Sequence, residues 1–161
     1  FHCLNCFNPE TWDFNGGKEW TEEVKEKFLK LVDRPYIKRI SILGGEPLAE
    51  ENLDGVLDLI NRIRLSCQQK SIWLYTGYTW ESIIEYETPF DNVMTAHNSD
   101  ILYDYYMWKR KNIISECNVL IDGQYIDSQR DITLPYRGSS NQRLIDIQQS
   151  LQKGEIVLCQ T

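Results

Sequence analysis

Apolar residues in the first part of the chain repeat with helical and strand periods in turn. One stripe at i, i+4, i+7 and i+8 predicts a helix that begins after Thr21 and ends before Pro35. Its members are Val24, Phe28, Leu31 and Val32. Residues 39–43 are a short run rich in β-branched side chains, which predicts a strand. A second stripe predicts a helix over about residues 49–66, and it consists of Leu53, Val56, Leu57, Ile60 and Ile63.

The same patterns continue toward the C-terminus with shorter elements. Strands are predicted at residues 71–76, 92–95, 118–121 and 155–158. Helices are predicted at residues 79–86 and through Leu144, Ile147 and Leu151. Strands that alternate with helices over short connections are typical of an α/β fold with a mostly parallel sheet.

Residues 97–116 interrupt this alternation with clustered aromatic side chains and three consecutive cations. The aromatic residues include Tyr103, Tyr105, Tyr106 and Trp108, and the cations are Lys109, Arg110 and Lys111. Two interpretations are open: a helix packed on the body of the protein, or an aromatic surface for a partner. We expect the packed helix.

Composition describes an acidic globular chain. Of 161 residues, 42% are hydrophobic, which is enough to bury a core, and the length predicts one domain over residues 1–161. The net charge of −7 argues against a nucleic-acid partner, because binding needs cations to neutralise phosphates. The sequence has no run of eighteen apolar residues and no secretory pattern at its start, so we expect no membrane association. Five scattered cysteines, an odd number, indicate a reducing compartment and predict a cytoplasmic location.

Cys3 and Cys6 are the strongest candidates for metal ligands, because their spacing lets both thiolates reach one centre. A structural zinc needs four ligands, and apart from His2 and His97 no further histidine is available. A thioredoxin-like dithiol begins a helix after a strand, whereas an irregular aromatic stretch follows here. Iron–sulfur ligation explains more, because a cluster can leave one iron free to bind a substrate or cofactor.

Glycine turns follow three of the predicted strands, at Gly44–Gly45, Gly77 and Asp122–Gly123. Ligand-binding loops of parallel sheets lie at the carboxyl ends of the strands, so these turns predict one shared rim that faces a ligand. Taken alone, residues 44–47 are typical of a tight turn before a helix. Beside two candidate metal ligands, they favour a cofactor site.

Several stretches resemble the radical SAM enzymes. Residues 3–8 resemble the end of the Cys-x3-Cys-x2-Cys motif of that superfamily, and residues 44–47 resemble its glycine-rich motif after the second strand. Within the superfamily the chain resembles the anaerobic (class III) ribonucleotide-reductase-activating proteins. This likeness is carried by residues 7–12, 43–48, 73–81, 119–123 and 136–143. It spans the chain apart from about residues 96–116, which resemble an insertion.

The resemblance implies an α/β fold with an incomplete, open (βα) barrel of the radical SAM type. It implies that Cys3 and Cys6 are ligands of a 4Fe–4S cluster, with a third cysteine four positions before Cys3 and the first strand also upstream of Phe1. The free iron would bind the amino and carboxylate groups of S-adenosylmethionine, and Asn5 and Phe7 would flank its adenosyl part.

The same resemblance places the glycine-rich turn against the methionine part of the cofactor. Gly44 and Gly45 would let the ligand approach the backbone, and carbonyl groups there would accept hydrogen bonds from the ammonium group. Glu46 has two open roles, as a nearby charge or as a cap of the following helix. Residues 136–143 have three: cofactor binding, partner docking or ordering of the C-terminal segment.

As chemistry, the resemblance implies a glycyl-radical activase. A flavodoxin-like or other one-electron reductant would reduce the cluster, and the electron would split the sulfonium into methionine and a 5′-deoxyadenosyl radical. That radical would remove a hydrogen atom from a glycine Cα on the large subunit of anaerobic ribonucleotide reductase. The alternatives are an activase of another glycyl-radical enzyme, of the pyruvate formate-lyase type, and a non-enzymatic zinc-binding module.

Overall fold

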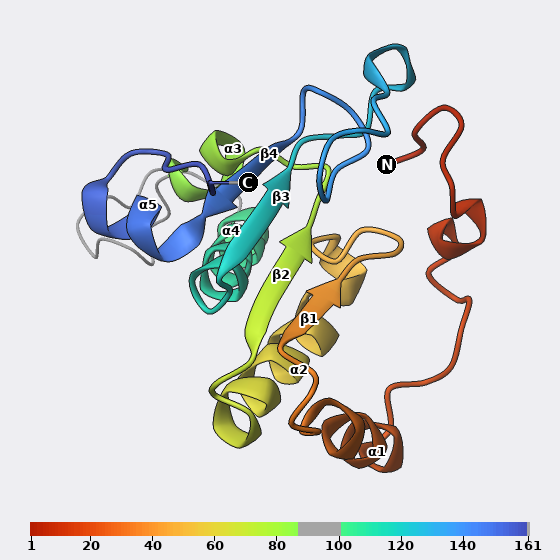
Figure 1. Ribbon diagram of the computed structural model, residues 1–161. Coiled ribbons are helices and arrows are strands. Elements are labelled where there is room, and N and C mark those ends of the chain that lie inside the picture. Colours follow the sequence, from red (N-terminus) through yellow and green to blue (C-terminus); the bar gives the residue numbers. More distant parts are fainter. Residues whose placement is uncertain (87–100, 161) are drawn as a thin grey trace.

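The chain folds around an open, four-stranded sheet with strand order β1-β2-β3-β4 (Figure 1). The computed structural model describes residues 1–86 and 101–160. The strands are β1 (Arg39–Ile42), β2 (Ser71–Tyr75), β3 (Val119–Asp122) and β4 (Arg143–Asp146). The first three are parallel to one another, and β4 runs antiparallel to β3. The α/β class and the mostly parallel sheet expected from the sequence are confirmed.

Five α-helices are described around this sheet. They are α1 (Glu22–Val32), α2 (Leu53–Ser66), α3 (Trp80–Ile84), α4 (Ile101–Ser115) and α5 (Ile147–Lys153). Short 3-10 turns are η1 (Pro9–Trp12), η2 (Glu50–Asn52) and η3 (Asp127–Gln129). Thr21 caps α1 as predicted, because its side chain accepts a hydrogen bond from the backbone N–H of Val24. In the two described ranges, no helix is long and apolar enough to cross a membrane.

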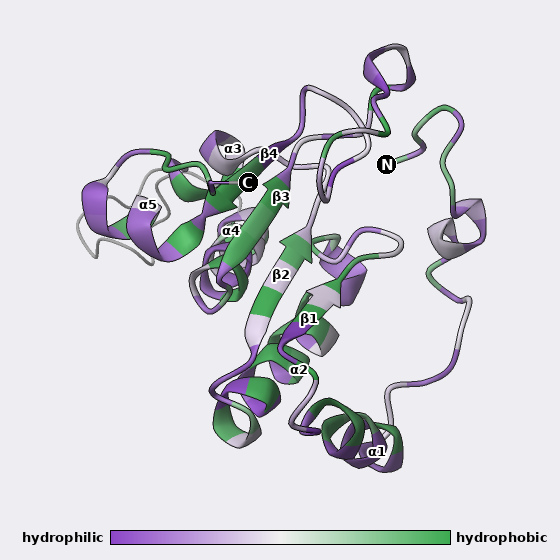
Figure 2. Cartoon of the chain, viewed as in Figure 1, coloured by the Kyte–Doolittle hydropathy of each residue, from purple (hydrophilic) through white to green (hydrophobic). Residues whose placement is uncertain are grey.

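Buried and more exposed side chains alternate along β1 and β2, so the two faces of the sheet differ. Ile40 is paired with Ile72, and Leu74 is paired with Leu120, so buried positions stand side by side on the face that the helices cover. All four residues of β3 are buried, and Figure 2 shows most of that strand green. A smaller cluster on the opposite face contains Val119, Ile121 and Leu144, with Trp73 and Tyr75 packed against it. This second face leads to the carboxyl rim of the sheet.

Helix α4 confirms the packed interpretation of residues 97–116 for the part that is described. Met107, Ile113 and Ile114 are almost fully buried and belong to the main core. Arg110 is also buried, and its Nε donates a 2.9 Å hydrogen bond to the carbonyl of Leu48. The helix therefore packs on the body and holds the segment that follows the glycine-rich turn.

Two C-terminal predictions are wrong. Leu144 was expected on a helix with Ile147 and Leu151, but it lies in β4, and the helix begins only at Ile147. Asp146 caps that helix by accepting from the N–H of Gln149, which ends the strand and starts the helix within one residue. Residues 155–158 form no strand, only an isolated bridge between Ile145 and Leu158.

The remaining expected elements agree apart from their ends. The helix predicted from residue 49 begins with the turn η2 and continues as α2, and the helix predicted at residues 79–86 is the short α3. The strand predicted at residues 92–95 lies outside the described residues.

Candidate functional site

Three glycine turns meet at the carboxyl ends of the parallel strands, as the sequence predicts. Gly44 and Gly45 follow β1, Gly77 follows β2, and Gly123 follows β3. All of them line one cavity of about 530 Å³. Cys3 and Cys6 line the same cavity, although they lie near the N-terminus, well before the first strand. The rim thus brings the two candidate ligands and the glycine turns together.

The two cysteines form a tight turn of their own. The backbone N–H of Cys6 donates to the carbonyl of Cys3 at 3.1 Å. Asn5, at the third position of this turn, has a φ of 55°, which asparagine tolerates better than most residues. The N–H of Asn8 donates to the sulfur of Cys6 at 3.4 Å. Both thiols are partly exposed, and thiolates are the ligands that iron–sulfur clusters take from proteins.

No third ligand joins them among the described residues. Within residues 1–86 and 101–160, no three His, Cys, Asp or Glu side chains are grouped closely enough to hold a metal ion. Cys67 and Cys117 are fully buried in the main core, and burial raises the pKa of the Cys117 thiol to about 12. The apolar surroundings of Cys67, Cys117 and Cys159 in the sequence predict buried small hydrophobes, which Cys67 and Cys117 are, whereas Cys159 is only partly buried.

Two rim glycines make room for the N-terminal segment. A Cβ atom on Gly45 would lie 2.5 Å from the carbonyl oxygen of Thr11, and one on Gly77 would lie 2.5 Å from the ring of Phe1. Phe1 also packs edge-on against Tyr78, with ring centroids 5.1 Å apart. The sequence suggested that Gly45 admits a ligand to the backbone. In the structure, its missing side chain admits the backbone of the segment that carries the cysteines.

Glu46 links two of the glycine turns. Its side chain is buried, and Oε1 accepts hydrogen bonds from the N–H of Leu48 at 2.9 Å and from the hydroxyl of Thr76 at 2.7 Å. Its other oxygen accepts from the N–H of Gly77 at 2.8 Å. Of its two open roles, the cap of the following helix is not observed, because neither η2 nor α2 has a side-chain cap and Glu46 accepts from the turn before them. The clamp on the turn after β2 had no signal in the sequence, because Thr76 lies 30 positions away.

An ion-pair network joins α3 to the end of β3 and the start of β4. Arg143 donates to both oxygens of Glu81 at 2.8 Å and to Oδ1 of Asp122 at 3.0 Å. Asp122 is almost fully buried and accepts a further hydrogen bond from the N–H of Trp80 at 2.8 Å. Hydrogen bonds from Arg143 lower the pKa of Glu81 to about 2, and those to Glu81 and Asp122 raise the pKa of Arg143. The network fixes the start of α3 beside the end of β3.

Residues 136–143, whose role the sequence left open, order the loop after β3. The side-chain oxygen of Gln142 accepts from the N–H groups of Gly138 and Ser139 at 3.0 and 3.2 Å. Its amide nitrogen donates to the carbonyl of Gly123 at 3.0 Å. Gln142 therefore ties this stretch to the turn after β3, while cofactor binding and partner docking stay predictions.

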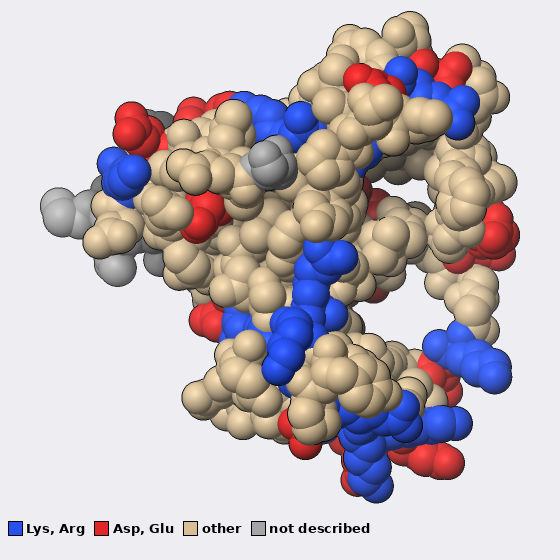
Figure 3. Space-filling view, in the orientation of Figure 1, with Lys and Arg blue, Asp and Glu red and all other residues tan. Residues whose placement is uncertain are grey.

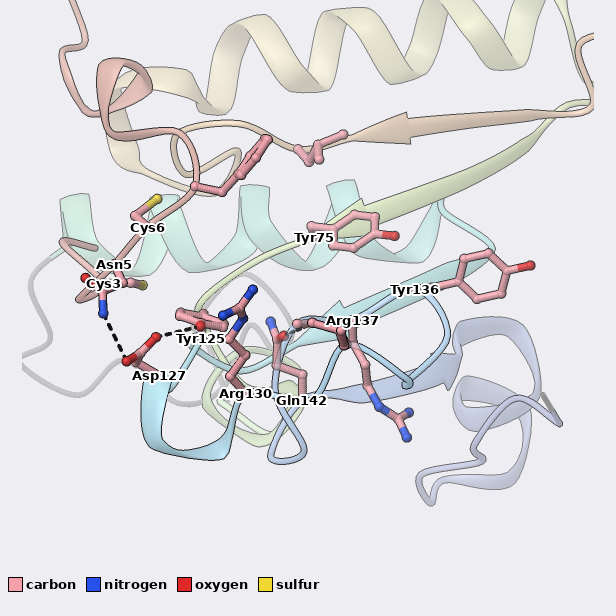
Figure 4. A pocket seen from close by; sticks show the side chains of 14 residues that line it. Cys3, Asn5, Cys6, Tyr75, Tyr125, Asp127, Arg130, Tyr136, Arg137 and Gln142 are labelled. Atoms are coloured by element: carbon pink, nitrogen blue, oxygen red, sulfur yellow. Dashed lines mark hydrogen bonds between the residues drawn. The ribbon is translucent and has the colours of Figure 1, made fainter.

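A second cavity of about 1,040 Å³ adjoins the first (Figure 4). It shares Cys3, Cys6 and Gln142 with the smaller cavity and extends along the loop after β3. In Figure 4, Arg130 points up between Tyr125 and Gln142. Exposed apolar side chains also line it, namely Phe7, Leu43 and Ile132, of which Phe7 is 100% exposed. Such a cavity suits a partner that brings its own apolar groups.

Charged side chains of both signs are mixed over the face shown in Figure 3. Blue side chains run from the region of α1 up toward the open face of the sheet. Open hollows separate the N-terminal segment from the body in this view. The segment therefore rests on the rim at a few places and is not packed along its length.

Comparison with known proteins identifies the family of the chain. Residues 1–145 match the family model of a 4Fe-4S single cluster domain. The chain is 31% identical to the anaerobic ribonucleoside-triphosphate reductase-activating protein of Vibrio cholerae and 32% identical to that of Escherichia coli K12. Each match covers 87% of this chain and 77% of the relative.

A more distant relative has the same name. The activating protein of enterobacteria phage T4 is 27% identical over 88% of this chain and 74% of its own length. No solved structure matches the chain. The cysteine turn, the glycine rim and these likenesses agree, and the chain belongs to the family of anaerobic ribonucleoside-triphosphate reductase-activating proteins.

Proposed function

We propose that this chain is a radical SAM activase that generates a glycyl radical on anaerobic ribonucleotide reductase. The observation that carries the proposal is that Cys3 and Cys6 line one cavity with Gly44, Gly45 and Glu46. The sheet, with its ligand cavity at the carboxyl ends of parallel strands, supports a single radical SAM domain with an incomplete barrel. The names of the relatives support the reductase as the partner.

In this proposal Cys3 and Cys6 would supply two thiolates to a 4Fe–4S cluster. A third cysteine, expected four positions before Cys3, would supply another. When bound, the cluster supplies the electron that cleaves S-adenosylmethionine reductively. The partial exposure of both thiols leaves the centre open to the smaller cavity, where the cofactor would lie. A volume of about 530 Å³ is within the usual range for a small-molecule site.

The chain's own residues orient the cofactor. Carbonyl groups at Gly44 and Gly45 would accept hydrogen bonds from its ammonium group, and Asn5 and Phe7 would flank its adenosyl part. Glu46 shapes the wall of the site, because its carboxylate already accepts hydrogen bonds from three donors of the chain. Its negative charge adds electrostatic attraction for the ammonium group without direct contact.

The larger cavity takes the protein substrate. A glycine-bearing segment of the reductase would lie along Phe7, Leu43 and Ile132, next to the thiols and the cofactor. Its apolar wall excludes water from the glycine Cα that loses a hydrogen atom. A flavodoxin-like or other one-electron reductant would reach the exposed cysteine turn, and the cytoplasm would supply the reducing compartment.

Anaerobic reconstitution with iron and sulfide tests the proposal. The protein as it occurs naturally, with any upstream residues, should bind about four irons per chain. Once reduced, it should cleave S-adenosylmethionine. A Cys6→Ala variant should lose both properties and keep its fold, whereas Cys159→Ser, at a cysteine outside the rim, should keep both. Tight zinc binding without iron uptake would contradict the proposal, since it would support the zinc module.

The partner is tested separately. The loaded protein should produce a glycyl radical signal on anaerobic ribonucleotide reductase and none on pyruvate formate-lyase. The opposite selectivity would favour the activase of the other glycyl-radical enzyme.

A further inference from the structure

Asp127 receives hydrogen bonds from two parts of the chain that are far apart in sequence. Its Oδ2 accepts from the side-chain amide of Asn5 at 3.0 Å, across 122 positions. Its Oδ1 accepts from the hydroxyl of Tyr125 at 2.9 Å. Figure 4 shows both bonds as dashed lines, with Asp127 between Asn5 and Tyr125. The carboxylate thus connects the cysteine turn to the loop after β3.

Asn5 is the residue through which both thiols can be held at once. It lies between Cys3 and Cys6 in a turn that the Cys6 N–H closes on the Cys3 carbonyl. Because Asn5 has the positive φ of this turn, a fixed side chain at this position fixes the orientation of the turn itself. Anchoring Asn5 therefore anchors the sulfur atoms on either side of it.

The rest of the N-terminal segment has weaker attachments. Among the described residues, the Asn5–Asp127 bond is the one hydrogen bond that links residues 1–20 to the remainder of the chain. Phe1 contacts Gly77 and Tyr78 through its ring, and Thr11 approaches Gly45 closely. These contacts hold the two sides of the cysteine turn, and the bond to Asp127 holds the turn.

We infer that Asp127 is a positioning residue that holds the Cys3–Cys6 turn at the mouth shared by the two cavities. The role of the thiols as cluster ligands rests on the proposed function, but the attachment does not. Tyr125 holds the second oxygen of Asp127 and lines both cavities, so it fixes the direction in which the carboxylate faces Asn5.

Thiol alkylation of the cluster-free protein measures this attachment directly. Rates of iodoacetamide labelling at Cys3 and Cys6 are determined peptide by peptide with mass spectrometry. The variants Asp127→Ala and Asn5→Gly should each raise both rates roughly threefold to tenfold, the range expected for loss of one exposed hydrogen bond. Glycine at position 5 keeps the positive φ available and removes only the side chain.

A matched control lies on the same loop. Within the described part of the chain, the side chain of Asp131 accepts hydrogen bonds only from Thr133 in its own turn, so Asp131→Ala should leave the labelling of both cysteines unchanged. Tyr125→Phe should have a smaller effect than Asp127→Ala, because the bond to Asn5 remains. Cys159 provides an internal reference at a distance from the rim, and its rate should stay constant in every variant.

A double-variant cycle distinguishes direct coupling from general loosening. If Asn5 and Asp127 act through one bond, the Asn5→Gly/Asp127→Ala protein should label at the rate of either single variant. The inference would be overturned if the rate increases of the two single variants multiplied in the double variant. It would also be overturned if the single variants labelled as slowly as Asp131→Ala. Failure of the natural protein to bind iron would instead overturn the proposed function and leave these rates as they are.

Discussion

Buried carboxylates hold the rim of the sheet, whereas the N-terminal segment is held by surface contacts. Asp122 and Glu46 are both less than 10% exposed, and each is paired with donors from other elements. Residues 1–20 have hydrogen bonds mainly to one another, and one bond, from Asn5 to Asp127, links them to the body within the described chain. The two regions nevertheless line the same cavity.

This difference assigns separate tasks to the two regions. The rim is preorganised, so a cofactor that binds there meets walls already in position. The thiols lie on the segment with fewest attachments, and metal–thiolate bonds would supply the order that packing does not. We therefore expect substitutions in the ion-pair network of the rim to change stability, and substitutions that loosen the segment to change ligand binding.

The largest expected effect is at Arg143. Arg143→Met should lower the free energy of unfolding by about 3 kcal/mol, because it leaves the buried carboxylate of Asp122 without its ion pair. Urea unfolding followed by circular dichroism measures it. Arg62→Met removes partly exposed pairs with Asp58 and Glu22 and should cost clearly less. Equal losses of unfolding free energy in the two variants would contradict the view that the buried ion pair stabilises the rim.

Gly45 tests the contact between the two regions. Gly45→Ala places a Cβ 2.5 Å from the carbonyl of Thr11, so the N-terminal segment should detach while the sheet stays folded. Limited proteolysis should then cut within residues 9–18 several times faster than in the unchanged protein. Gly55 in α2 has no atom within 4 Å of such a Cβ. Gly55→Ala should instead raise stability by about 0.5–1 kcal/mol and leave the cleavage rate unchanged.

The smallest effect is the pH dependence that Glu81 contributes. Its pKa in the folded protein is about 2, below the ordinary value of 4.5. Its stabilising contribution is therefore complete above pH 4.5 and is lost as the pH falls toward 2. The stability gap between the unchanged protein and Glu81→Gln should be largest at pH 7 and shrink below pH 4.5. A gap that is constant with pH would contradict this assignment.

Much of the rim could be predicted from the sequence. Glycine turns after β-branched runs place Gly44, Gly77 and Gly123 at one edge of a parallel sheet. The spacing of Cys3 and Cys6 predicts a metal centre, which stays a prediction. These signals are local, because each depends on residues within a few positions of one another. The resemblance to radical SAM enzymes joined the two motifs before the fold was known.

The contacts between distant segments had no such signal. Nothing near Asp127 marks it as a partner of Asn5, and nothing near Glu46 points to Thr76 and Gly77. Leu144 was assigned to a helix because its spacing with Ile147 is helical, yet it pairs with Ile121 in the sheet. Tertiary pairing overrides local period in so short an element.

The central claim is that the cysteine turn and the glycine rim form one cofactor site. Electron paramagnetic resonance of the reconstituted, reduced protein tests it most directly. We expect S-adenosylmethionine to change the cluster signal in the unchanged protein, and to need a higher concentration for the same change in Gly45→Ala, where the two regions separate. A full complement of iron with a signal that S-adenosylmethionine does not alter would contradict the account.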